Sequence, residues 1–135
     1  MSAILTVREY RAACSYAGSW LEREHLALLP PGTPTNSSCA IYLLCSSCPL
    51  TGHPRVSYVG KADRRRGGGD VADRLLEHLR SAKAPLVNWV AVIPLHAETP
   101  PAQVGSIEGR IARYFGVPLL CRAVPEGRSR RGARG

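Results

Sequence analysis

The apolar residues of this chain occur in short runs that are separated by segments rich in glycine, proline and arginine. Over residues 4–29 they recur at spacings of three and four, which predicts helix. Gly18 is a candidate for a break within this stretch, and the prolines that begin at Pro30 end it. We therefore interpret residues 1–36 as an N-terminal helical extension followed by a proline-rich linker.

The next apolar runs have the length of strands rather than helices. Residues 39–45 read CAIYLLC, and residues 55–60 read RVSYVG, with turn-forming residues between them. This pattern predicts an antiparallel hairpin with a long loop. The strongly apolar residues 86–93 predict a third strand.

Two further helices are expected around this third strand. Residues 70–82 follow a basic, glycine-rich loop at 63–70 and carry an apolar stripe, and residues 102–114 lie between two prolines and Gly116. A short strand or an extended segment is expected over residues 119–124. Residues 126–135 contain four arginines and no large apolar residue, so we expect a disordered basic tail.

The order helix, hairpin, helix, strand, helix predicts an α+β fold. We expect a small antiparallel or mixed three-stranded sheet flanked by helices over residues 37–125, preceded by the N-terminal extension. A length of 135 residues and an apolar content of 44% suit one such domain.

Charge and cysteine content narrow the class of protein. The formal net charge is +8, with 18 basic and 10 acidic residues, and nearly all the cations are arginines. Guanidinium groups bind phosphates through paired hydrogen bonds, so a nucleic-acid partner is favoured, although a compositional bias toward arginine is an alternative explanation of the ratio. No apolar run approaches the roughly 18 residues of a membrane span, and no export signal is visible, so a cytoplasmic protein with reduced thiols is expected.

Several polar residues occupy the strands and helices in a distinctive order. Tyr42 ends the tripeptide AIY on the first strand, and Tyr58 begins the tripeptide YVG on the second. Arg74 and His78 are four residues apart on the next expected helix, and Glu108 is on the last one. In this order the residues resemble the motifs of the GIY-YIG nucleases, and Lys61 matches a frequent basic position of that family.

The resemblance implies a metal-dependent endonuclease that acts on DNA. It implies that Tyr42 orients or activates water, that Arg74 neutralises charge on the phosphate, and that Glu108 holds Mg²⁺ or Mn²⁺. His78 assists Tyr42, because a free phenol with a pKa near about 10 is a poor base at neutral pH. Tyr58 is expected to orient water or a backbone phosphate, and the expected nucleic-acid contacts are Lys61, Arg64, Arg65 and Arg66.

The chain departs from the family pattern in three respects. Ala40 stands where the first motif has glycine, and the spacers before Tyr58 and before Arg74 are longer than usual. The segment that begins at Val117 contains no counterpart of the asparagine that the family often has there. Considered singly, the two tyrosines are also compatible with ordinary strand aromatics, and Glu108 with a helix surface. The alternative function is therefore a GIY-YIG-like module that binds nucleic acid without cleaving it, with a partner protein or a homodimer as a further option.

A second set of residues has the composition of a zinc site. Cys39, Cys45, Cys48 and His53 include a CxxC spacing near the hairpin loop. Cysteine is also a common small core residue, so zinc is the less favoured interpretation. A zinc-stabilised interaction protein remains a third functional class.

Overall fold

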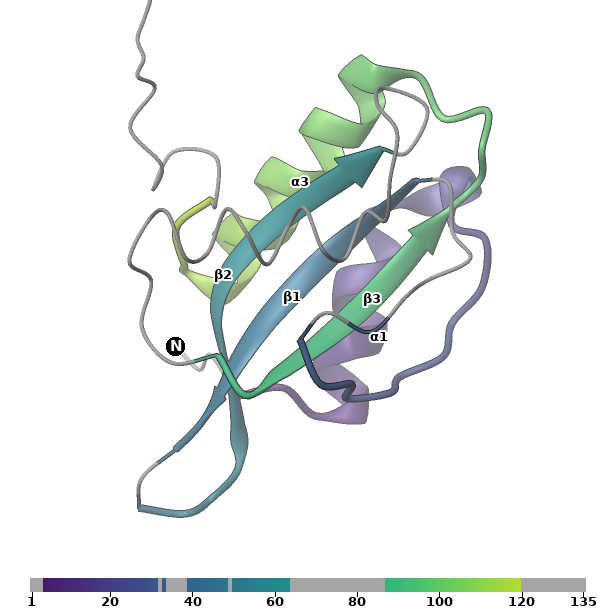
Figure 1. The fold of residues 1–135 in the computed structure, drawn as a ribbon. Helices are drawn as coiled ribbons and strands as arrows, with labels where there is room; N and C mark the ends of the chain where they lie inside the picture. Colours follow the sequence, from purple (N-terminus) through teal and green to yellow (C-terminus); the bar gives the residue numbers. More distant parts are fainter. Residues whose placement is uncertain (1–3, 32, 34–38, 49, 64–86, 120–135) are drawn as a thin grey trace, which may run out of the picture.

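The computed structural model describes residues 4–31, 33, 39–48, 50–63 and 87–119. Within these ranges the chain forms two α-helices, one short 3-10 helix and three strands (Figure 1). In chain order the elements are α1 (Val7–Ser15), η1 (Gly18–Trp20), β1 (Cys39–Ser47), β2 (Pro54–Asp63), β3 (Trp89–Leu95) and α3 (Pro101–Phe115). The expected helix at 70–82, the loop at 63–70 beyond Asp63 and the tail at 126–135 lie outside the described residues.

The three strands form one antiparallel sheet in the order β2-β1-β3. The hairpin prediction is confirmed, since β1 and β2 pair along their lengths with an irregularity between Leu44 and Cys45. The third predicted strand is also confirmed, and it pairs with the other side of β1. The fold class is therefore α+β with a small antiparallel sheet, as the order of elements predicted. In the described part of the chain, no helix has the length and apolar content needed to cross a membrane.

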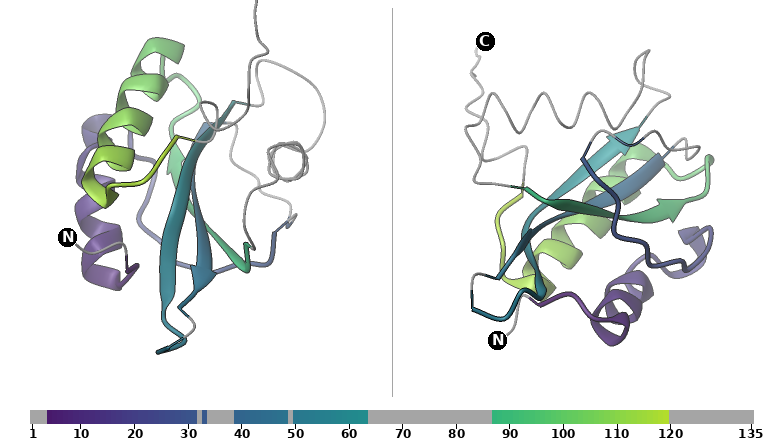
Figure 2. Two further views of the ribbon diagram at one scale, coloured as in Figure 1. Left: turned by 90° about the vertical axis from the view of Figure 1, so that its left-hand side faces the viewer. Right: turned by 60° about the horizontal axis from the view of Figure 1, so that its bottom comes forward.

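Side chains on the central strand β1 point alternately to the two faces of the sheet. Ile41 and Leu43 face one way and join a large apolar cluster with residues of both α-helices. Tyr42 and Leu44 face the other way and join a smaller cluster with Val90. Figure 2 shows α1 and α3 together on one side of the sheet. All seven residues from Cys39 to Cys45 are buried, so β1 supplies apolar surface to both layers.

Helix α1 belongs to the same core as the sheet. Its buried residues Tyr10, Ala13 and Cys14 share the large cluster with Ile41 and Phe115. The helix begins after Thr6, whose hydroxyl oxygen accepts a hydrogen bond from the Glu9 amide, as expected for an N-cap. The helical prediction is thus correct for the first part of the extension.

The helical prediction is wrong for residues 21–29. These residues follow the outer edge of β3, with bridges at Leu21 and Leu29, and we call residues 20–29 the N-terminal strap. The Leu29 amide donates to the Val90 carbonyl at 3.0 Å and the Val90 amide to the Leu29 carbonyl at 2.8 Å. At the other end, the Glu22 amide donates to the Pro94 carbonyl at 2.9 Å. An edge strand offers unpaired backbone groups, and pairing with them outweighs the local helical pattern of the strap.

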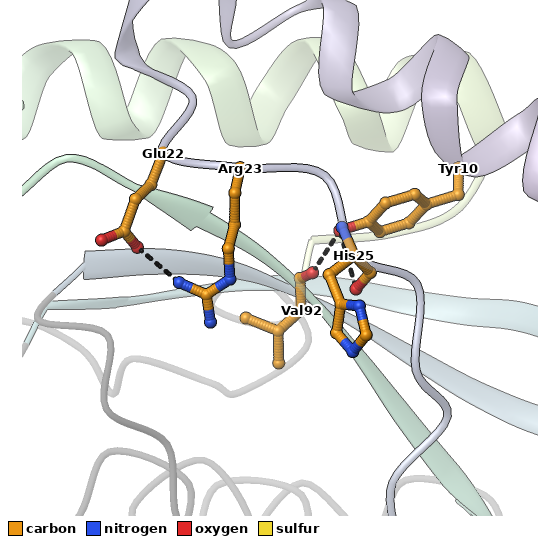
Figure 3. A network of polar contacts seen from close by, with 5 residues as sticks. All are labelled: Tyr10, Glu22, Arg23, His25 and Val92. Carbon is orange, nitrogen blue, oxygen red and sulfur yellow. Dashed lines mark hydrogen bonds and ion pairs between the residues drawn. The ribbon is translucent and has the colours of Figure 1, made fainter.

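Tyr10 fixes the middle of the strap to the sheet (Figure 3). Its phenol donates to the Val92 carbonyl at 2.8 Å, and the His25 amide donates to the phenol oxygen at 3.4 Å. The Tyr10 side chain therefore joins α1, the strap and β3. Burial raises the pKa of Tyr10 above its ordinary value, so the phenol keeps its proton at alkaline pH.

The last helix agrees closely with its prediction. Pro101 is the first residue of α3, where a missing amide proton is harmless, and Gly116 ends the helix with a φ of 69°. The Val59 amide then donates to the Pro118 carbonyl at 3.2 Å, and Leu119 forms a parallel bridge with Val59. Of the predicted segment 119–124, only Leu119 lies within the described residues.

Substitution of Tyr10 by phenylalanine tests this arrangement. Tyr10→Phe keeps the ring but removes the donor to the Val92 carbonyl, so we expect the free energy of unfolding to fall by about 1–2 kcal/mol. Urea denaturation measures the change. The matched control is Tyr16→Phe, a half-buried tyrosine in the same segment, for which a change below about 0.5 kcal/mol is expected. Equal effects of the two substitutions would contradict the role of the Tyr10 hydroxyl.

Candidate active site

The two tyrosines of the candidate site lie on the same face of the sheet. In the register of the hairpin, Tyr42 is opposite Gly60 and Tyr58 is opposite Leu44. Directly opposed residues of antiparallel strands project to the same side, so Tyr42, Leu44 and Tyr58 share one face. Both tyrosines belong to the smaller apolar cluster. The hairpin therefore brings the AIY and YVG tripeptides side by side.

Their environments differ in exposure. Tyr42 is on the central strand and only 2% exposed, whereas Tyr58 on β2 is half-buried. Gly60, directly beside Tyr42 in the register, has no side chain to cover this part of the face. The two phenols therefore form a pair with one deeply buried member and one member that reaches solvent.

Lys61 and Glu108 belong to the other side of the sheet. Lys61 is opposite Ile41, so its side chain leaves β2 on the face that α3 covers. Its ammonium nitrogen lies 3.5 Å from the position that a Cβ on Gly105 would occupy. Glu108 is one helical turn beyond Gly105 on α3 and is 3% exposed. Lys61 is therefore close to α3 at Gly105, which precedes the candidate metal ligand Glu108 by one helical turn.

The candidate residues accordingly approach from two directions. Tyr42 and Tyr58 lie on the face opposite the two described helices, while Glu108 is on one of those helices. A reaction centre common to all three would have to reach both faces of the sheet. Sequence spacing gave no sign of this separation, because β1 is apolar on both faces and α3 can cover either of them.

The remaining candidates are not described by the structure. Arg74 and His78 lie outside the described residues, as do the predicted nucleic-acid contacts Arg64, Arg65 and Arg66. Their roles remain predictions that follow from the resemblance.

A magnesium ion is compatible with Glu108 as a donor. Mg²⁺ accepts one or two carboxylates and keeps several of its waters, so a single glutamate is a sufficient protein ligand when phosphate oxygens complete the shell. Among the described residues, no group of three or more His, Cys, Asp or Glu side chains is arranged to hold a metal. If Mg²⁺ is bound there, Glu108 is the residue that would hold it, through a carboxylate that is 3% exposed.

The residues considered for zinc are spread along the hairpin. Cys39 and Cys45 are buried at opposite ends of the same face of β1, and the Cys45 thiol donates to the Leu43 carbonyl. Cys48 and His53 close the turn between β1 and β2 through a 2.8 Å hydrogen bond from the Cys48 amide to the His53 carbonyl. A second backbone hydrogen bond, from the Gly52 amide to the Cys48 carbonyl at 2.8 Å, also holds this turn.

The thiol of Cys48 differs from the buried thiols in its acidity. Hydrogen bonds from the Thr51 side chain, and then from the Thr51 and Leu50 backbone, lower the pKa of Cys48 to about 7. Burial raises the pKa of Cys45 to about 12 and that of Cys14 to about 11. At neutral pH, only Cys48 of these three has a substantial thiolate fraction.

Alkylation by iodoacetamide checks this difference. The rate at Cys48 should rise with pH and level off above about 7, because the thiolate is the reactive form, while Cys14 and Cys45 stay unmodified. Peptide mass spectrometry in a Cys121→Ser background measures the rates, since Cys121 lies outside the described residues. Thr51→Val should move the midpoint at Cys48 upward. If the pH midpoint of Cys48 alkylation lay at the ordinary thiol value in protein that retains Thr51, the result would contradict the hydrogen bonding described above.

Comparisons with known proteins assign no family to the chain. No family model, no curated protein and no solved structure matches it. The resemblance to the GIY-YIG nucleases therefore rests on five residues and their order: Tyr42, Tyr58, Arg74, His78 and Glu108.

Proposed function

We propose that this chain is an Mg²⁺-dependent endonuclease or nickase that hydrolyses phosphodiester bonds in DNA. The observation that carries the proposal is the pairing of Tyr42 and Tyr58 on one face of an antiparallel hairpin. The order of motif residues along the sequence and the net charge of +8 support it further.

The tyrosine pair would act on the attacking side of the phosphate. Tyr42, held by strands on both sides, orients the water molecule and receives its proton with help from His78. Tyr58, which is half-buried, contacts water or a backbone phosphate oxygen. Arg74 neutralises the charge that builds on the phosphate during attack. The rigid sheet keeps the two phenols in register, so little reorganisation accompanies the reaction.

Glu108 would hold the metal ion, which supplies charge stabilisation for the leaving oxygen when it is bound. The carboxylate is attached to a helix with five apolar residues in the large cluster, which fixes its position. Lys61 would contact a phosphate at the β2 edge, where its ammonium lies beside Gly105. DNA bound there would contact β2 from the side of α3, with the tyrosines on the other face of the sheet.

A module that binds nucleic acid without cleaving it is the second candidate. The observation in its favour is that Glu108 and the tyrosines belong to opposite faces of the sheet. The absence of an asparagine after Pro118, in Leu119 to Arg122, points the same way. Such a module would keep the charge-dependent binding and lose turnover.

Incubation of purified protein with supercoiled plasmid separates the two candidates. The nuclease proposal expects conversion to the nicked form with Mg²⁺ and none with EDTA, at a rate proportional to protein concentration. Retarded migration on a gel without any nicked product, over a range of Mg²⁺ and Mn²⁺ concentrations, would leave the binding module as the function.

Glu108→Gln tests the assignment of the metal ligand. The amide has nearly the same size as the carboxylate but is a poor ligand for Mg²⁺, so cleavage should fall by about a hundredfold or more while DNA affinity is nearly unchanged. Nicking rates and fluorescence anisotropy measure the two quantities. The control is Glu98→Gln, an exposed glutamate before α3, which should cleave at the normal rate. A Glu108→Gln protein that nicks as fast as this control would remove Glu108 from the mechanism.

A further inference from the structure

An exposed seam runs between α1 and α3, on the side of the molecule away from Tyr42 and Tyr58. We define the α1/α3 seam by three arginines and two tyrosines. The rings of Tyr16 and Tyr114 are in contact, with centroids 5.8 Å apart, and the Tyr114 phenol donates to a Glu9 carboxylate oxygen. These contacts join α1 and α3 directly. The remaining members of the seam are Arg8, Arg110 and Arg113, all exposed.

The arginines of the seam occupy the outer surfaces of the two helices. Arg110 and Arg113 are three residues apart on α3, so they lie on neighbouring turns of one helical face. The buried residues of α3 point toward the sheet, which leaves this face to solvent. Arg8 is on the first turn of α1, next in the chain to Glu9, whose carboxylate accepts the hydrogen bond from Tyr114. Arg8, Arg110 and Arg113 are therefore exposed cations on two helices that the contacts of Tyr114 join.

These three cations are not neutralised within the described part of the chain. The ion pairs found there are Arg11 with Glu24 at 3.6 Å and Arg23 with Glu22 at 3.3 Å. Neither involves an arginine of the seam.

The acidic residues near the seam offset only part of its charge. The Glu9 carboxylate keeps its negative charge when it accepts a hydrogen bond from the neutral Tyr114 phenol, so it offsets one of the three arginines, and the only acidic residue of α3, Glu108, is buried. The seam is therefore a surface of net positive charge built on two packed helices.

We propose that the α1/α3 seam binds the phosphate backbone of DNA as a second contact, separate from the site of cleavage. Arginine binds phosphate oxygens with charge-assisted hydrogen bonds, and exposed unpaired arginines retain their full attraction for them. This inference rests on the proposed function, because it takes DNA as the ligand.

The composition of the seam favours nucleic acid over a membrane surface. A helix that lies on a membrane needs a continuous apolar face beside its cations. The exposed residues of α3 beyond its first turn are Ser106, Arg110 and Arg113, and its apolar face is buried in the core. The helix therefore has charge but no exposed apolar face, which suits phosphate contact from water.

The position of the seam determines what it would do for the enzyme. It is on the helical side of the sheet, whereas Tyr42 and Tyr58 are on the other side. DNA bound at the seam would thus be a different segment from the one at the tyrosines. The seam should raise affinity, and it should not alter the rate of cleavage once DNA is saturating.

Salt-dependent binding of two double variants tests the inference. Arg110→Gln/Arg113→Gln removes two unpaired cations, and Arg11→Gln/Arg23→Gln removes two that are already paired with glutamates, so both variants lose the same formal charge. Each phosphate contact contributes about 0.9 to the slope of log affinity against log salt for duplex DNA. We expect the first variant to lower this slope by about two units and the second by less than about half a unit. Addition of Arg8→Gln to the first variant should lower it by about one more.

Fluorescence anisotropy with a duplex oligonucleotide at several salt concentrations gives the slopes, and thermal denaturation verifies that all variants fold. Equal slopes for the two double variants would overturn the seam, because the effect would then depend on net charge alone. The seam would also be overturned if the Arg110→Gln/Arg113→Gln variant lost retention on anionic vesicles while its DNA affinity did not change. Plasmid nicking at saturating DNA is measured in parallel. If the slopes change as expected but the protein never nicks plasmid, the seam is supported and the nuclease proposal is rejected. If the protein nicks plasmid but the slopes do not change, the nuclease proposal is supported and the seam is rejected.

Discussion

The structure depends on the burial of β1 on both faces and its pairing on both edges. Seven consecutive residues, Cys39 to Cys45, are removed from water, and β2 and β3 satisfy the backbone groups on the two sides. Burial of this strand requires an apolar layer on each face, and the two clusters described above are those layers. Among the described candidates, Tyr42 and Tyr58 join the smaller layer, and Glu108 belongs to a helix of the larger one.

Much of this arrangement was predictable from local patterns. CAIYLLC and RVSYVG have the length and composition of strands, and Pro101 and Gly116 mark the ends of α3. The strap was not predictable in this way. Leu21 and Leu28 are seven residues apart, as on one face of a helix, but the backbone of this segment pairs with β3, a partner about 70 residues away in the sequence. The periodicity of apolar residues indicates which side chains are buried, but it does not indicate which edge strand the backbone pairs with.

The same limit applies to the candidate site. Opposed positions on a hairpin follow from the strand assignment, so the shared face of Tyr42 and Tyr58 could be inferred in advance. The relation between Tyr42 and Glu108 could not, because Ile41 and Tyr42 are equally apolar neighbours and each is suited to packing against a helix. The choice between the two candidate functions therefore depends on which face of β1 is covered by α3, and the sequence pattern does not determine this. The arginines of the seam were likewise visible as charges, but the glutamates that pair with Arg11 and Arg23 become apparent only in three dimensions.

The contacts of α1 also constrain the order in which the chain can fold. The Tyr10 phenol bonds to a carbonyl 82 residues later, and Glu9 bonds to a phenol 105 residues later. Although α1 is made early during synthesis, its apolar face has no complete surface to pack against until β3 and α3 have been translated. A nine-residue helix is marginal in isolation, so α1 and the strap should be among the last parts to become protected. Until then, the outer edge of β3 is open to pairing with other chains, which makes the partly folded protein prone to aggregation.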